Sequence, residues 1–133
     1  AAPGRPLPGL GDLPTLVDRV EAAGLSVELH TRGEPYPLPP IVDTTAYRVV
    51  QEALTNCLRH ADVEHAELEL TFGPAAVEIA VVDRHPAGEP GAAREGNGMR
   101  GMRERVELIG GTLTAGPGAD GFGVQARLPL VAA

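Results

Sequence analysis

Three polar side chains recur every four residues in the stretch YRVVQEALTNCLRHA, which runs from Tyr47 to Ala61. The carboxylate of Glu52, the amide of Asn56 and the imidazole of His60 form one stripe on a helix of about 3.6 residues per turn. Apolar residues fill the adjoining sector, so the stripe borders the buried face. An amide oxygen suits Mg²⁺ when phosphates supply the other ligands, and a carboxylate can act as a base. Taken singly, each residue is equally typical of a partly solvated helix.

Two further segments hold polar groups that packing does not require. Asp83 ends an apolar strand pattern and faces a long loop. In GNGMRGMRER, Gly96, Gly98 and Gly101 lack side chains where a helix begins, and the free amides of a helix start favour anions. A glycine cluster alone is also typical of a plain loop. The same segment adds positive charge at Arg100, Arg103 and Arg105.

Several kinds of chemistry are excluded by the residues present. All eleven basic residues are arginine, so a lysine-dependent P-loop and Schiff-base catalysis are both ruled out. Cys57 is the single cysteine, which excludes an internal disulfide, and its place in the apolar helix sector predicts a small buried hydrophobe. The four histidines lack zinc-ligand spacing, and no GxSxG motif occurs.

The amino-acid composition limits which partners the protein can bind and where in the cell it can lie. A chain of 133 residues with 43% hydrophobic content can form one domain with a real core. A net charge of −7 and an aromatic content of 3% argue against nucleic acid as a partner. The apolar runs are too short to span a bilayer, and no leader pattern opens the chain. We therefore expect a cytoplasmic domain without membrane contact, which could belong to a larger membrane-anchored protein.

Hydrophobic periodicity predicts the order helix, strand, long helix, hairpin, helix, hairpin. Residues 1–10 are rich in Pro and Gly and predict a linker, so the domain occupies 11–133. The loop at about 84–98 is long enough to be a lid or binding loop. We expect helices at 12–23, 43–61 and 99–110, and strands at 25–31, 65–72, 76–83, 112–117 and 123–130.

These elements predict an α/β (α+β) two-layer sandwich. The helices are too few to cover both faces of a sheet, so we expect them on one face. The two hairpins make the sheet mixed but mostly antiparallel.

Three segments, in this order, resemble motifs of the catalytic ATP-binding domain of bacterial sensor histidine kinases. QEALTNCLRHA resembles the N-box, VVD the adenine-binding strand end, and GNGMRGMRERVELIGGTL the glycine box. Within the family, GMRERVELIGG is similar to the subfamily that signals to response regulators with helix-turn-helix output. The resemblance extends from about Leu10 to Leu130. The GMRERVELIGG segment also argues against another protein class with the same fold, the serine kinases that act on anti-sigma-factor partners.

The resemblance implies the Bergerat fold of the GHKL superfamily, with ATP and Mg²⁺ as cofactors. It also implies a phosphoacceptor helical domain, whose histidine receives the γ-phosphoryl group, and a response regulator as partners. Asn56 would correspond to the Mg²⁺ ligand, Glu52 to the catalytic acid of the N-box, and His60 to a residue near the phosphates. Asp83 would accept a hydrogen bond from the adenine amino group. The lid and helix start would bind the nucleotide through Gly96, Asn97, Gly98, Met99, Arg100, Gly101 and Met102.

The chain departs from the family pattern at two places. The residues after Asp83 read RHPAG, with His85 and Ala87 where glycines are expected, and GFG at 121–123 lacks the usual threonine. Side chains at 85 and 87 would narrow an adenine pocket, and the segment 121–123 would lack a threonine hydroxyl near the adenine, so each change would weaken nucleotide binding. They motivate the alternative of a degenerate Bergerat-fold domain that acts as an interaction or regulatory module. The phosphoacceptor motif is not found among the 133 residues.

Overall fold

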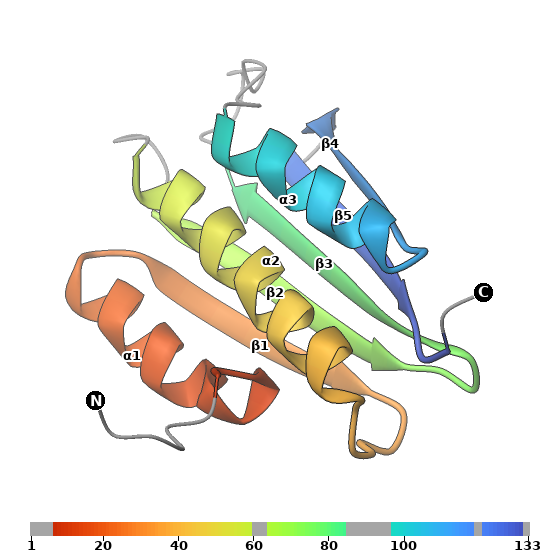
Figure 1. The fold of residues 1–133 in the computed structure, drawn as a ribbon. Helices are drawn as coiled ribbons and strands as arrows, with labels where there is room; N and C mark the ends of the chain where they lie inside the picture. Colours follow the sequence, from red (N-terminus) through yellow and green to blue (C-terminus); the bar gives the residue numbers. More distant parts are fainter. Residues whose placement is uncertain (1–6, 60–63, 85–96, 119–120, 132–133) are drawn as a thin grey trace, which may run out of the picture.

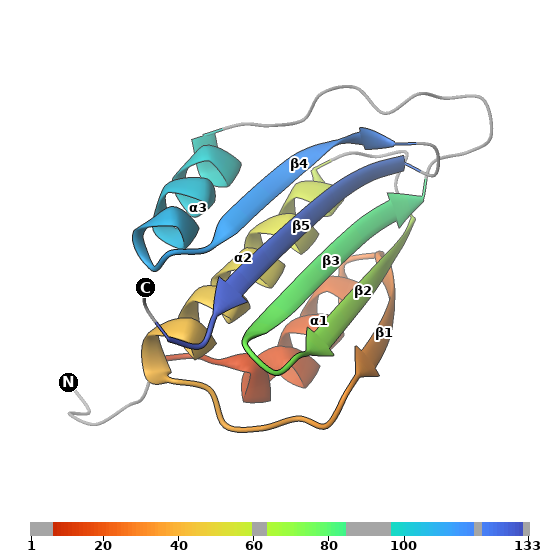
Figure 2. The same ribbon diagram turned by 90° about the vertical axis from the view of Figure 1, so that its right-hand side faces the viewer.

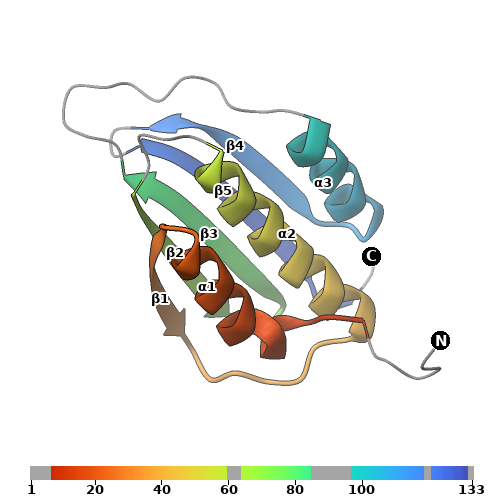
Figure 3. The same ribbon diagram turned by 90° about the vertical axis from the view of Figure 1, so that its left-hand side faces the viewer.

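The computed structural model describes residues 7–59, 64–84, 97–118 and 121–131. The chain forms three α-helices and one β-sheet within these residues. Figure 1 shows the helices in front of the sheet, and Figures 2 and 3 show that they lie on the same face of it. The elements are η1 (Leu10–Asp12), α1 (Leu13–Ala22), β1 (Ser26–Arg32), α2 (Pro40–Leu58), β2 (His65–Phe72), β3 (Ala76–Arg84), α3 (Asn97–Leu108), β4 (Thr112–Gly118) and β5 (Gly121–Pro129).

The sheet has five strands in the order β1-β2-β3-β5-β4. β1 pairs with β2 in parallel, whereas the β2–β3, β3–β5 and β5–β4 pairs are antiparallel. α2 provides the crossover that the parallel pair requires, since it lies between β1 and β2 in the chain. The predicted two-layer sandwich with a mixed, mostly antiparallel sheet is therefore confirmed.

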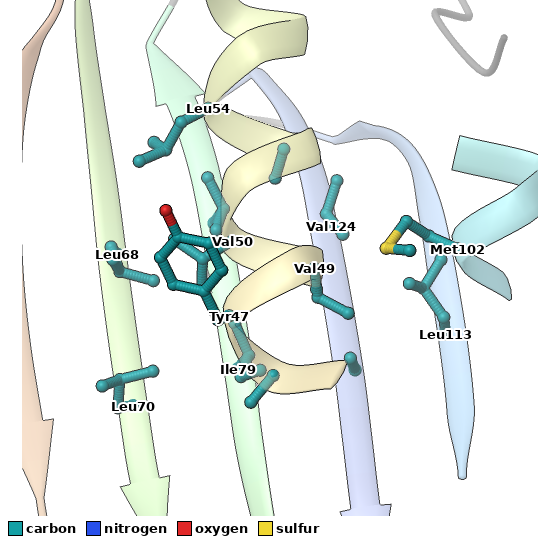
Figure 4. Close-up of a cluster of buried hydrophobic side chains, with 14 of the residues drawn as sticks. Tyr47, Val49, Val50, Leu54, Leu68, Leu70, Ile79, Met102, Leu113 and Val124 are labelled. Carbon is teal, nitrogen blue, oxygen red and sulfur yellow. The ribbon is translucent and has the colours of Figure 1, made fainter. Parts of the chain in front are cut away.

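The core lies between α2 and the middle of the sheet (Figure 4). The fully buried side chains of α2 that pack on the sheet include Val49, Val50 and Leu54. On the sheet itself, the side chains of Leu68 in β2 and Ile79 in β3 are fully buried beneath the helices. Apolar and polar residues alternate along these strands, so one face of the sheet packs against the helices and the other face is exposed to solvent. Among the helices of the described residues, none is long and apolar enough to cross a bilayer.

Local sequence explains where the helices begin and end. α2 begins at Pro40 instead of near Asp43 because a proline suits the first helical position, whose N–H has no partner inside the helix. After α1 the chain turns at Gly24, where φ is +110°, and after α3 it turns at Gly110, where φ is +83°. Both glycines adopt a left-handed conformation that a side chain would disfavour.

In strand β1 the apolar Val27 and Leu29 alternate with polar residues, which is typical of a strand with one buried face, yet the strand is largely exposed. Leu29 is 42% exposed and Val27 is only partly buried. The reason is its position at the edge of the sheet, where Leu29 lines an open groove of about 400 Å³ together with Leu13 and Tyr36. β5 also begins at Gly121, inside the predicted turn, because Gly121 and Phe122 already pair with β4.

Candidate functional site

Helices α2 and α3 flank an open cleft of about 590 Å³. Successive turns of α2 supply one wall, because residues three or four apart share a helix face. The predicted Glu52, Gly98, Gly101 and Met102 are brought together here from the two helices. The complete lining is Arg48, Gln51, Glu52, Thr55 and Arg59 from α2, and Gly98, Gly101, Met102 and Arg105 from α3.

The Glu52 carboxylate lies against the backbone of Gly98. A Cβ atom built at Gly98 would overlap Glu52 Oε1, whereas a Cβ at Gly101 would meet no heavy atom within 4 Å. The Glu52 side chain is 23% exposed, and its Oε2 lies 3.9 Å from Nη1 of Arg59. The two predicted glycines therefore differ: only at Gly98 would a Cβ force a neighbouring side chain, that of Glu52, to move.

Positive charge predominates in this cleft, where three arginines accompany one carboxylate. Arg48 is oriented by a hydrogen bond from its Nη1 to Oε1 of Gln51, 2.9 Å long. Of the three arginines predicted near the α3 start, only Arg105 lines the cleft. Arg103 donates from Nε to the carbonyl of Leu113, 3.2 Å away, and so ties α3 to β4, while Arg100 is exposed. The cleft is chemically suited to an anion.

Asp83, at the end of β3, is buried with 1% of its surface exposed. The backbone N–H of Phe122 donates to its Oδ1 at 2.9 Å, and Sγ of Cys57 lies 3.9 Å from its Oδ2. Gly121 has a φ of +142°, and a Cβ there would overlap the Asp83 carbonyl oxygen. Strand β5 can therefore approach Asp83 this closely only with glycine at 121.

Sequence reasoning missed Cys57 as a neighbour of Asp83, and it placed residues 121–123 near the adenine pocket only through the family resemblance. Cys57 was predicted to be a small buried hydrophobe, and it is indeed buried, but its thiol also contacts the carboxylate. The sequence did indicate this contact in one way, because Cys57 follows Asn56 on the buried side of α2. For Phe122 no signal existed, since its backbone N–H makes the contact and every residue except proline has one.

Asn56 is also buried, with 8% of its surface exposed, and Met99 is buried at the start of α3. Neither Asn56 nor Asp83 is among the residues lining the cleft. The predicted site thus divides into an open part at Glu52 and an interior part that holds Asn56 and Asp83. Asn97 begins α3. His60, Gly96, His85, Ala87 and most of the predicted lid lie outside the described residues.

Two curated relatives match most of the chain. It is 37% identical over 126 residues to the sensor histidine kinase YxjM of Bacillus subtilis, covering 92% of this chain and 30% of that protein. It is 36% identical over 92 residues to the oxygen sensor histidine kinase NreB of Staphylococcus carnosus, covering 68% of this chain and 26% of that protein. The chain therefore spans less than a third of either relative. A comparison with protein-family models found no match.

Solved structures share the fold. The ATP-binding domain of PrrB from Mycobacterium tuberculosis aligns with a TM-score of 0.57 at 25% identity, over 88% of this chain and 93% of that one. The blue-light activated histidine kinase of Erythrobacter litoralis aligns with a TM-score of 0.65 at 22% identity, over 92% and 42%, a likeness of fold alone. Sequence and fold together show that the chain belongs to the sensor histidine kinase family, in which it corresponds to the ATP-binding catalytic domain.

Proposed function

We propose that the chain binds ATP with Mg²⁺ and donates the γ-phosphoryl group to a histidine of a separate phosphoacceptor helical domain, from which it passes to a response regulator. The observation that carries this proposal is the placement of Glu52 against Gly98 in an arginine-lined cleft. A carboxylate, a helix start and positive charge meet there, which is what positioning a triphosphate for transfer requires. The names of the relatives support the same activity.

The triphosphate would lie between α2 and the start of α3. The first turn of α3, which begins at Asn97 and includes Gly98 and Met99, would present backbone N–H groups that favour an anion. Arg59 and Arg105 line the same cleft and would neutralise phosphate charge. Glu52, the acidic residue of the N-box, would assist the transfer.

Asn56 fits the role of the Mg²⁺ ligand, because its amide supplies a neutral oxygen on the helix that carries Glu52. When bound, Mg²⁺ would neutralise charge on the phosphates. Burial of Asn56 limits the rotamers of its side chain, so its amide is held near one orientation.

Asp83 would recognise the adenine amino group as a hydrogen-bond acceptor. The backbone N–H of Phe122 and the thiol of Cys57 contact its two oxygens and would hold the carboxylate in place as an acceptor. Because Asp83 is 1% exposed, a base can reach it only if the side chains that cover it move. His60 and the lid residues, Gly96 and Asn97 among them, would complete the nucleotide site.

The domain would extend over 11–133 with a lid at about 84–98, preceded by a linker at 1–10. We place this domain in the cytoplasm, without contact to nucleic acid or membrane. One of the two relatives is named an oxygen sensor and the other is named for no signal, so the signal received by this protein does not follow from the likeness.

One observation favours the alternative of a degenerate module. The burial of Asp83 and its two internal contacts would equally suit a carboxylate that serves only to join β3, α2 and β5. Such a domain would keep the fold and act through its surface.

Calorimetric titration with a non-hydrolysable ATP analogue separates the two proposals. The kinase proposal predicts saturable binding with one site per chain that is tighter with Mg²⁺ than with EDTA, because Asn56 and the phosphates share the ion. Millimolar analogue should also raise the unfolding temperature, since a ligand bound only by the folded state stabilises it. Absence of both effects would support the degenerate module.

A further inference from the structure

The cleft between α2 and α3 continues beyond the residues of the candidate site. The two helices lie side by side and run in opposite directions (Figure 1), and a second hollow of about 330 Å³ opens between the start of α2 and the end of α3. Arg48 and Arg105 line both this hollow and the cleft, so the two form one α2–α3 groove. Its apolar end is lined by Leu7, Ile41, Thr44, Thr45, Leu108 and Ile109.

Large apolar residues at this end of the groove are exposed to solvent. Leu108 is 85% exposed and Ile41 is 61% exposed, and Leu7 is exposed beside the same hollow. A single exposed apolar residue is ordinary on a protein surface, but several of them gathered around a hollow mark a surface that binds another molecule. The apolar end of the groove is therefore a candidate docking surface.

Two arginines lie between the apolar end and the candidate site. Within the part of the chain that the structure describes, neither Arg48 nor Arg105 forms an ion pair with a carboxylate. This positive region contrasts with the net charge of −7 of the whole chain. A partner that fits the groove must therefore present acidic side chains next to apolar ones.

The groove has the shape of a site for a helix. A helix fits as a ridge into the hollow between two packed helices, whereas a flat membrane surface would meet only the rims of such a groove. Ile41 and Glu52 both line it from α2, and their spacing corresponds to about 16 Å or three turns, so they share one helix face. A helix lying along the groove would contact Ile41 with one turn and approach Glu52 with a turn about 16 Å away.

We propose that the apolar end of the α2–α3 groove is the docking surface for the phosphoacceptor helical domain. This docking rests on the proposed function, which requires the acceptor histidine to reach a phosphoryl group beside Glu52. Apolar residues of the acceptor helix pack on Ile41 and Leu108, and an acidic residue faces Arg48. The histidine, about three turns further along the same helix, then lies at the nucleotide end of the groove.

An NMR titration of the chain with a phosphoacceptor helical domain of a sensor histidine kinase, without nucleotide, tests the proposal. Amide signals along the apolar end should shift. The double variant Ile41→Gln with Leu108→Gln should raise the Kd for that domain by about tenfold or more. The rate of phosphoryl transfer at a low concentration of the domain should fall by the same factor, whereas the Kd for an ATP analogue should stay at the parent's value. Both residues are exposed, so each single variant can report if the double variant folds poorly.

Leu29→Gln is the matched control. It changes an exposed leucine on β1, at the edge of the sheet opposite to β4 and α3, and should leave docking and transfer at the parent's values. The proposal is overturned if the double variant docks as the parent does, or if Leu29→Gln weakens docking equally. It is also overturned if the parent alone forms a dimer in sedimentation that Leu108→Gln dissociates, which would make the groove an interface between two copies.

Failure of the kinase proposal gives a different result, because docking is measured without nucleotide. Docking that the double variant weakens, in a chain that binds no ATP analogue, would defeat the kinase proposal and support the docking surface. Transfer that the double variant leaves unchanged would have the opposite meaning.

Discussion

Asp83 joins three elements through a single carboxylate. It ends β3, its Oδ1 accepts from the β5 backbone at Phe122, and its Oδ2 lies beside the Cys57 thiol of α2. A buried carboxylate requires hydrogen-bond partners of this kind, because burying it without them would destabilise the folded state. If Asp83 also recognises adenine, these contacts hold the acceptor in place before the nucleotide binds.

Replacing Asp83 with Asn tests its recognition role with little change in shape. The Asn amide oxygen can still accept from Phe122, but its NH₂ group would face the amino group of adenine. We expect the Kd for an ATP analogue to rise roughly tenfold to hundredfold, which corresponds to loss of a charged hydrogen bond of about 1.5–3 kcal/mol. Calorimetry measures this change.

Glu52→Gln is the control for this variant. It should retain binding and lose phosphoryl transfer, since Glu52 is assigned to catalysis and not to affinity. Unchanged affinity in Asp83→Asn, together with normal unfolding, would remove the adenine assignment and favour the degenerate module.

Helix α3 carries two glycines with opposite surroundings. Gly98 packs against the Glu52 carboxylate of α2, whereas the space beside Gly101 is open. Both lie within α3, where glycine is otherwise unfavourable because it loses more backbone freedom on folding than alanine does. This makes the pair a matched comparison within one helix.

We predict that Gly101→Ala increases the free energy of unfolding by about 0.5–1 kcal/mol, the difference in helix propensity. Gly98→Ala should lack this gain and stay near the parent's stability, because the Glu52 carboxylate must rotate away from the added Cβ, at a cost of about 0.5–1.5 kcal/mol that offsets the propensity gain. Urea denaturation measures both changes. Equal responses of the two variants would contradict the close contact between Gly98 and Glu52.

The connector between β1 and α2 is held by one tyrosine. The hydroxyl of Tyr36 donates to the carbonyl of Gly73, 2.5 Å away in the β2–β3 turn, and its ring meets Phe72 edge-on with centroids 5.2 Å apart. Tyr36→Phe keeps the ring and removes the hydrogen bond, so we expect the unfolding free energy to fall by about 0.5–1.5 kcal/mol. Thermal unfolding measures this change.

Tyr36→Leu, which also removes the aromatic contact, should cost more than Tyr36→Phe. If Tyr36→Phe unfolds at the parent's temperature, the hydroxyl contributes nothing and the ring alone holds the connector.

The match to the Bacillus subtilis relative covers 30% of that protein. The proposed function assigns the acceptor histidine to a separate domain. We predict that the chain incubated with γ-labelled ATP acquires no stable label, because none of its four histidines lies in a phosphoacceptor context. Adding a phosphoacceptor helical domain of the same family should produce acid-labile label on that domain. Labelling of the chain itself on histidine would contradict this assignment.

The sequence by itself determined the order and type of the elements. Apolar residues at intervals of two and of three to four predicted the strands and helices, and the glycines after α1 and α3 marked where those helices end. These properties depend on a few neighbouring residues, so they can be read without knowledge of the fold. Glu52, Asn56 and Asp83 were recognised as candidates because each is a polar group beside an apolar pattern.

The tertiary structure alone decided which distant residues meet. The contact of Cys57 with Asp83, the difference between Gly98 and Gly101, and the use of Arg105 instead of Arg103 in the cleft all depend on how separate elements pack. The facing of Glu28 and Glu67 depends on the register of two strands separated by the whole of α2. Sequence periodicity assigns a residue to a face, but only packing between elements sets what that face touches.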